Sequence, residues 1–424
     1  MNGKLNGTSS CPKYKMLLNQ NSHKPVYLKL LKLSLFLYLS FGRWGAQIGF
    51  PKYGVYIFDV VFFLSIMLYL LKGPAGYHKE EKSQNKHNIL VIFICSILIL
   101  YWMIENSKYS FITLIRDLLP LFMVLLTPIL IRITRLLSKI ELIILLRTAS
   151  AVSSVWYGPQ VLGILPTLDF STSSLNLVLF SSRNDWSTAV LAIGISVWGK
   201  RFGNLKQNYW LVSYFSLIGF LQLSRIGTFV IILSILSILK KSQILFWIPI
   251  IIAFASIVFI LIPEFSSQTS GINRAFNLLG YSENENTTQE YTARARVSAW
   301  TLVIKEISMN QNWVFGLGPG REIIKESKAF VYLSGKEDVR SPHNFFLTLM
   351  MRFGFIGTII WISYYKKIMK LNNKDKFTNL INHILRIIII ISSVGVILEN
   401  LFALIPFNIL YCSIVEKDHK SDKN

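Results

Sequence analysis

The chain has 424 residues, of which 52% are hydrophobic, and a formal net charge of +22 at pH 7. The hydrophobic residues form long blocks separated by short Lys-rich or polar stretches, which excludes an ordinary soluble domain and is typical of bilayer-spanning helices. The positive charge lies in the short loops between these blocks and forms no continuous patch or nucleic-acid-binding motif, so we expect no nucleic-acid partner.

In chain order, the apolar blocks predict an all-α, polytopic membrane protein with about twelve transmembrane helices in a single membrane domain, 1–424. The first block lacks a small-residue cleavage site after it, and we expect it to be retained as a helix. The predicted spans are 27–47, 54–72, 88–104, 110–131, 140–158, 184–199, 208–223, 226–239, 243–263, 343–365, 382–400 and 402–415.

The loops between the spans alternate in basic content. Loops rich in Lys and Arg, such as 132–139 and 366–376, alternate with loops that hold single basic residues, such as Arg43. The positive-inside rule then predicts both termini in the cytoplasm and a long extracytoplasmic loop, 264–341, between the ninth and tenth spans.

Charged residues near the predicted outer membrane surface are candidate functional groups. Arg116 and Asp117 lie inside the fourth span, where they either pair locally and hold helices together or line a polar cavity. Arg183 precedes the sixth span, where a snorkelling arginine needs no function. Arg225 lies in the tight turn 224–227, which fixes its guanidinium at the outer surface, for function or for topology.

The outer loop is expected to contain a helix, because apolar residues recur there at helical spacing: Val297, Trp300, Ile304 and Ile307. Arg296 precedes Trp300 by four residues, so the two side chains share one face of this helix. Arg294 projects about 200° around the helix from Arg296. Of these two arginines, Arg296 is therefore the better oriented, because it lies beside Trp300.

Two further motifs follow in the same loop. Gly316, Gly318 and Gly320 could expose N–H groups to an anion, but no strand precedes them and Pro319 lacks a donor, so a tight turn is favoured. His343 is the one histidine on the predicted outer side. With Ser341 as N-cap and Pro342 as the first helical residue, it would lie in a first helical turn, where the dipole favours the neutral base.

Arginine and histidine together suit transfer of a group from a diphosphate. Guanidinium groups form charge-assisted hydrogen bonds with phosphate oxygens. No Asp-x-Asp pair occurs and Asp338 is the one aspartate of the long loop, so we expect no metal and no other cofactor. The simplest reaction is inverting glycosyl transfer, in which His343 deprotonates an acceptor hydroxyl that attacks the anomeric carbon as the diphosphate leaves.

The chain resembles the O-antigen ligase and polymerase superfamily of bacterial envelope enzymes. The resemblance spans roughly 183–360 and rests on motifs in the family's order: Ser224-Arg225, Arg296 to Trp300, Phe315 to Gly318, and Pro342 to Leu347 with Gly354 and Gly357 following. It implies a multi-pass glycosyltransferase of the bacterial cytoplasmic (inner) membrane that acts in lipopolysaccharide and surface-polysaccharide biosynthesis. The implied donor is an undecaprenyl-diphosphate-linked oligosaccharide.

By the same resemblance, Arg225 and Arg296 would contact the diphosphate, and His343 would be catalytic. Membrane lipid and a chain-length regulator are the other expected partners. The candidate supporting residues are Arg116, Arg183, Arg294, Arg340 and Asn344.

Three other readings remain open. The shared motifs do not separate polymerases from ligases that transfer glycan to lipid A-core, and polymerase is favoured because no ligation acceptor has a recognisable signature. A lipid-linked glycan flippase or secondary transporter would carry charges near the bilayer midplane and interrupted helices in both halves. A membrane scaffold would need only packed helices and a loop that contacts another protein.

Overall fold

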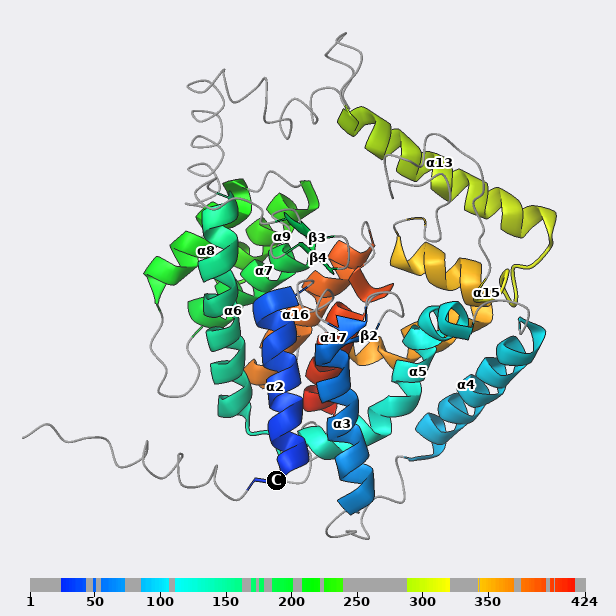
Figure 1. Cartoon of the computed structure of the whole chain (residues 1–424), viewed down its shortest axis with the longest axis horizontal. Helices are drawn as coiled ribbons and strands as arrows, with labels where there is room; N and C mark the ends of the chain where they lie inside the picture. The colour runs from blue at the N-terminus through cyan, green and yellow to red at the C-terminus, as the bar shows by residue number, and fades with distance from the viewer. Residues whose placement is uncertain are drawn as a thin grey trace, which may run out of the picture.

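The computed structural model describes residues 24–42, 49–50, 55–72, 85–106, 111–161, 169–172, 175–178, 185–200, 208–221, 225–238, 288–320, 342, 344–369, 375–393, 397–399 and 401–415. Within these ranges the chain is predominantly helical, and this part of the predicted fold class is confirmed (Figure 1). Two short antiparallel hairpins, which the sequence did not predict, accompany the helices.

The first eight helices described are α2 (Val26–Phe41), α3 (Ile57–Lys72), α4 (Asn85–Glu105), α5 (Phe111–Thr134), α6 (Lys139–Val161), α7 (Asp185–Gly199), α8 (Tyr209–Leu221) and α9 (Arg225–Leu236). The C-terminal elements are α13 (Thr288–Met309), α15 (Phe345–Tyr364), η5 (Lys366–Met369), α16 (Lys376–Ser392), η6 (Ile397–Glu399) and α17 (Leu401–Val415). The hairpins pair β1 (Gly49–Phe50) with β2 (Val55–Tyr56), and β3 (Asp169–Thr172) with β4 (Leu175–Val178).

The helices follow the predicted spans closely, with three corrections. The first helix ends at Phe41 and not at 47, because Gly42, with φ of 52°, forms its C-cap. The second helix begins at Ile57 and not at 54, because Val55–Tyr56 pair with Gly49–Phe50. The predicted span 382–400 is wrong at both ends, since α16 covers Lys376–Ser392. The early start reflects Asp375, whose carboxylate accepts hydrogen bonds from the N–H groups of Phe377 and Thr378. The predicted span 243–263 lies outside the described residues.

Three of the described helices are long and apolar enough to cross a membrane by length and composition: Thr113–Thr134, Lys139–Pro159 and Phe345–Tyr364. Other apolar helices are shorter, such as Tyr209–Phe220. Large apolar side chains on α3 and α4 point outward, among them Leu71 and Ile104, which are 72% and 75% exposed. Such outward apolar faces are what a bilayer would cover.

Helix α17 lies at the centre of the bundle. It packs on α2, α5 and α16 (Figure 1). Its side chains from Ala403 to Ile414 are buried, and Phe407 and Tyr411 join Trp361 and Tyr365 in an aromatic cluster with ring centroids 4.6–6.0 Å apart. This cluster fixes the C-terminal half of α15 against the core.

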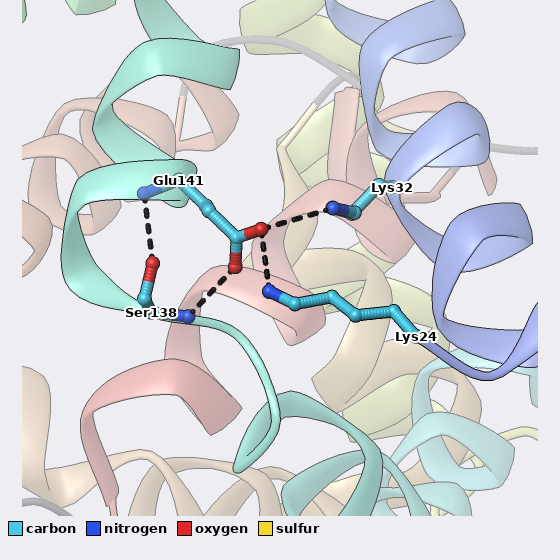
Figure 2. Close-up of polar contacts among 4 residues, drawn as sticks. All are labelled: Lys24, Lys32, Ser138 and Glu141. Atoms are coloured by element: carbon cyan, nitrogen blue, oxygen red, sulfur yellow. Dashed lines mark hydrogen bonds and ion pairs between the residues drawn. The ribbon is translucent and has the colours of Figure 1, made fainter. Parts of the chain in front are cut away.

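The starts of α2, α6 and α16 meet at one end of the bundle. Glu141 accepts hydrogen bonds from Lys24 Nζ at 2.5 Å, Lys32 Nζ at 3.2 Å and Ser138 N at 3.1 Å (Figure 2). Lys139 Nζ donates to Asp375 Oδ2 at 2.8 Å. These contacts agree with the sequence reading that placed the corresponding loops on one side of the membrane, and the assignment of that side to the cytoplasm stays a prediction.

The Glu141 contacts predict a stability effect. Glu141→Gln keeps the side-chain shape but removes the charge that two lysines share, and we expect it to lower the free energy of unfolding by about 2 kcal/mol. Glu105→Gln is the matched control, because Glu105 is an exposed acid at the end of α4. Thermal unfolding of the purified proteins in detergent should show a lower Tm for Glu141→Gln alone, and equal Tm values would contradict the structural role.

Candidate functional site

Helix α13, the helix predicted in the outer loop, lies beside α15 (Figure 1). Its buried face consists of Ala299, Val303 and Ile307, which pack against Leu317 and Met351. The predicted apolar face is therefore partly wrong. Val297 and Ile304 are 58% and 44% exposed, and only Ile307 of the predicted set is fully buried.

Arg296 and Trp300 share one face of α13, as predicted. Arg296 precedes Ala299 by three residues and Val303 by seven, so it continues the buried stripe. The indole Nε1 of Trp300 donates a hydrogen bond of 2.6 Å to the carbonyl oxygen of Pro342. This bond ties the arginine-bearing face of α13 to the residue that precedes His343 in sequence.

The Arg296 side chain is half-buried, and its Nε atom is buried without a hydrogen-bond partner in the described part of the chain. A buried polar atom of this kind normally has a partner, and it costs about 1–3 kcal/mol when it has none. An acceptor supplied by a ligand, such as a phosphate oxygen, would satisfy it.

The start of α15 differs from the prediction. The N-cap is Asn344, whose Oδ1 accepts a hydrogen bond of 3.1 Å from Leu347 N, and the first helical residue is Phe345. Ser341 and Pro342 were predicted to take these two positions. His343 therefore precedes the N-cap in sequence, and the argument that a helix dipole lowers its pKa does not apply. His343 itself lies outside the described residues.

The glycine motif forms a tight turn, as predicted, with φ values of 75° at Gly316, 89° at Gly318 and 85° at Gly320. These values lie in the region that glycine tolerates best. The turn packs against a break in α15 at Gly354, where φ is 62°. A Cβ atom on Gly354 would meet the carbonyl oxygen of Val314 at 2.2 Å, so the two backbones need a glycine to approach this closely.

The turn replaces the hydrogen bonds that the break removes from α15. A continuous helix would bond Phe355 N to Met351 O and Ile356 N to Arg352 O. Instead, Phe355 N and Ile356 N donate to the carbonyls of Trp313 and Val314, at 2.8 and 3.2 Å. Met351 O and Arg352 O accept from the N–H groups of Leu317 and Gly318, at 2.7 and 3.2 Å. The segment 313–318 is therefore wedged into two turns of the helix.

Asp117 connects α5 to this wedge. Its Oδ2 accepts a hydrogen bond of 2.8 Å from Gly320 N and lies 3.2 Å from Nη2 of Arg352. Arg352 is 2% exposed, so the ion pair is buried. Asp117 thus holds helices and the turn together, one of the two roles the sequence left open, while Arg116 is exposed. Sequence reasoning did not identify Arg352 as the partner of Asp117.

A second carboxylate, which sequence reasoning missed, lies near the start of α15. Glu399 Oε1 accepts a hydrogen bond of 2.7 Å from Thr348 Oγ1, one turn after the Asn344 N-cap. The sequence feature that could have revealed this carboxylate is Glu399 itself, an acid at the junction of the last two apolar blocks. This contact brings the connection between α16 and α17 to the same end of α15 as Trp300.

The side chains of several other predicted site residues lie outside the described part of the structure. Arg225 is the first residue of α9, and Arg294 lies in α13, but their side chains lie outside the described residues. Arg183, Arg340 and His343 also lie outside them. The structure thus joins Arg296 to the chain around His343 through Trp300 and Pro342, and the membership of the other arginines stays a prediction.

The fold and these contacts define a helical membrane protein whose polar cluster gathers where α13, α15 and α5 meet. Residues 210–362 match a family model described as O-antigen ligase. This match supports the resemblance to the O-antigen ligase and polymerase superfamily over these residues. The family consists of membrane enzymes of glycan transfer that act on lipid-linked oligosaccharides.

Neither the curated proteins nor the solved structures contain a match to this chain.

The buried ion pair predicts a second stability effect. Asp117→Asn leaves the buried guanidinium of Arg352 without its counter-charge, and we expect a loss of about 3 kcal/mol in the free energy of unfolding. Arg116→Ala is the matched control, since it alters the exposed neighbour on the same helix. Thermal unfolding should separate the two variants clearly, and an equal effect of both would show that the Asp117 contacts add nothing to stability.

Proposed function

We propose that this protein is a metal-independent, inverting glycosyltransferase that uses undecaprenyl-diphosphate-linked glycan at the outer face of the cytoplasmic membrane. The observation that carries the proposal is Arg296. Its buried Nε has no partner within the described ranges, and it lies one turn from Trp300, whose indole bonds to the residue before His343. A guanidinium whose buried Nε lacks a partner among the described residues, next to a segment that carries a histidine, suits a diphosphate ester beside its acceptor.

In the proposed reaction, His343 takes the proton of an acceptor hydroxyl, and the oxygen attacks the anomeric carbon of the donor sugar. The bond between that carbon and the diphosphate oxygen breaks, and undecaprenyl diphosphate leaves with the electron pair. Arg296 and Arg225 would stabilise the charge that develops on the leaving oxygen. A single displacement of this kind inverts the anomeric configuration.

The proposal includes an orientation. The Glu141 and Asp375 contacts gather at one end of the bundle, which we assign to the cytoplasm together with both termini. The segment 264–341, with α13 and the glycine turn, would then lie outside. About twelve spans complete this arrangement.

The break in α15 supports transfer over transport. Transporters use interrupted helices to direct free half-helix ends at a substrate or ion. Here the N–H groups of Phe355 and Ile356 donate to the carbonyls of Trp313 and Val314. The free end of this half-helix therefore bonds to the segment that forms the glycine turn, and not to a substrate or ion.

Polymerisation of repeat units is the activity we propose first. Ligation to lipid A-core is the second candidate, favoured by the description of the matching family model, O-antigen ligase. The two differ in acceptor, which is a growing lipid-linked glycan for the polymerase and lipid A-core for the ligase.

His343→Ala tests the base. The variant removes the proton acceptor, and we expect polymer formation to fall by about 10²-fold or more. Surface glycan from cells that carry equal amounts of each protein in the membrane is resolved by length on a gel. A ladder that collapses to single repeat units supports the polymerase. Full-length glycan that remains lipid-linked and fails to reach lipid A-core supports the ligase, and an unchanged pattern would remove His343 from the site.

Arg296→Lys tests the diphosphate contact. Lysine keeps the charge but loses the planar fork of donors, so we expect the donor KM to rise or kcat to fall by about tenfold or more. Lys305→Ala is the control on the same helix, because Lys305 is exposed. Equal turnover of lipid-linked donor by Arg296→Lys and the native protein would contradict a diphosphate role for Arg296.

A further inference from the structure

Helix α16 carries a polar stripe along its least buried face. Its sequence is rich in isoleucine, but Asn379, Asn382, His383 and Arg386 recur at three- and four-residue intervals and so share one face. Asn382 is 1% exposed, and the other three are half-buried. Asn382 is the member of the stripe that packs into the protein, where polar groups are costly unless they are satisfied.

Several atoms of this stripe lack partners. Within the part of the chain that the structure describes, both the Nδ2 and the Oδ1 of Asn382 are buried without a hydrogen-bond partner, and the same holds for Nε2 of His383. An amide that is buried with neither of its polar atoms bonded is unusual in a native protein, and it indicates a site where another polar group can bind.

Cations surround these atoms. The charges of Lys200, at the end of α7, and of Arg386 both act on the His383 imidazole. Arg386 is held in place by a hydrogen bond of 2.8 Å from its Nε to the carbonyl oxygen of Ile368. The Lys200 backbone is fixed by a bond of 3.0 Å from Nη2 of Arg147 to its carbonyl oxygen. Burial lowers the pKa of Lys200, so an anionic partner would stabilise its charged form.

The acid at the start of α16, Asp375, is engaged by other residues. Asp375 lies on the same side of α16, two turns before His383, but its carboxylate bonds to Lys139 and to Thr378. Partial burial raises the pKa of Asp375, but these hydrogen bonds outweigh it and leave that pKa below its ordinary value. The cluster therefore combines positive charge with unpartnered hydrogen-bonding atoms.

We propose that Lys200, Asn382, His383 and Arg386 form a binding site for an anionic phosphodiester that also carries hydroxyl groups, such as a phosphatidylglycerol headgroup. Lys200 and Arg386 would supply the charge, and Nε2 of His383 and Nδ2 of Asn382 would donate to phosphate oxygens. The Oδ1 of Asn382 would accept from a headgroup hydroxyl. Lys200, His383 and Arg386 each keep part of their surface exposed, so the headgroup can reach them.

The position of the cluster suits a lipid. It lies between the end of α7 and the first half of α16, and α16 begins at the end of the bundle where Glu141 is held by two lysines. Basic pockets between helices at the cytoplasmic surface are a known way to hold anionic headgroups. The site lies away from Arg296 and the start of α15, and its existence does not depend on the proposed transfer reaction.

Binding is tested on the purified full-length protein in detergent. Phosphatidylglycerol, phosphatidylcholine and inorganic phosphate are each titrated while the Tm is recorded, and bound lipid is counted by native mass spectrometry. The variants are Lys200→Ala and Asn382→Leu, with Lys376→Ala as the control, because Lys376 is an exposed cation at the start of the same helix.

We expect phosphatidylglycerol to bind the native protein and Lys376→Ala alike, and about tenfold more weakly to Lys200→Ala and Asn382→Leu. Asn382→Leu should also have an unchanged or higher Tm without lipid, because it removes an unsatisfied buried amide. This combination separates a binding role from a structural one. A response to inorganic phosphate alone would support the site with a soluble anion as its ligand.

Two results would overturn the proposal. The first is equal binding of phosphatidylglycerol and phosphatidylcholine together with no response to phosphate. The second is a native level of phosphatidylglycerol binding in both Lys200→Ala and Asn382→Leu.

Discussion

Backbone hydrogen bonding at membrane depth is the constraint on which the region around the site depends. A break in a spanning helix exposes N–H and C=O groups that lipid cannot satisfy. In α15 the break at Gly354 frees two helical hydrogen bonds, and the segment 313–318 satisfies all four groups. The segment 313–318 is therefore fixed at the middle of α15, and it fixes the position of the end of α13, which directly precedes it.

The position of Arg296 follows from this wedge. Helix α13 ends at Met309, directly before the turn, and its stripe Ala299, Val303 and Ile307 packs on Leu317 and Met351. Asp117 then ties Gly320 and Arg352 to α5. Residues that touch no substrate in the proposed reaction thus determine where a diphosphate-binding arginine could lie. Substitutions at Gly354 or Asp117 would be expected to disturb the outer site through geometry.

The two ends of the bundle use charge differently. At one end, Glu141 and Asp375 are fully engaged by lysines and fix the starts of three helices. Next to them, Asn382 and His383 of α16 hold buried polar atoms that have no hydrogen-bond partner among the described residues, beside Lys200 and Arg386. At the other end, Arg296 holds its buried Nε unpartnered beside Trp300. Buried polar atoms without partners therefore mark both places at which we propose a phosphate group to bind.

The sequence by itself determined the features that local periodicity and backbone chemistry encode. Apolar block lengths located most ends of the described helices within three residues, apart from the end of α2 and both ends of α16. The spacing of Arg296 and Trp300 predicted their common face, and the glycine motif predicted its turn. The superfamily was also recognisable, because its motifs are short and contiguous. These features depend on residues a few positions apart, and 3.6-residue geometry relates them without knowledge of the fold.

Only the tertiary structure decided which distant groups meet. Asp117 and Gly320 are 203 residues apart in sequence, and no periodicity could pair them or identify Arg352 as the counter-charge. The same holds for the wedge in α15 and for the burial of Asn382 in α16. The N-cap of α15 was mispredicted because Ser341 and Asn344 are both good caps, and the choice depends on where Trp300 holds Pro342. Long-range packing selects among locally acceptable options, and it was packing that placed Arg296 beside the start of α15.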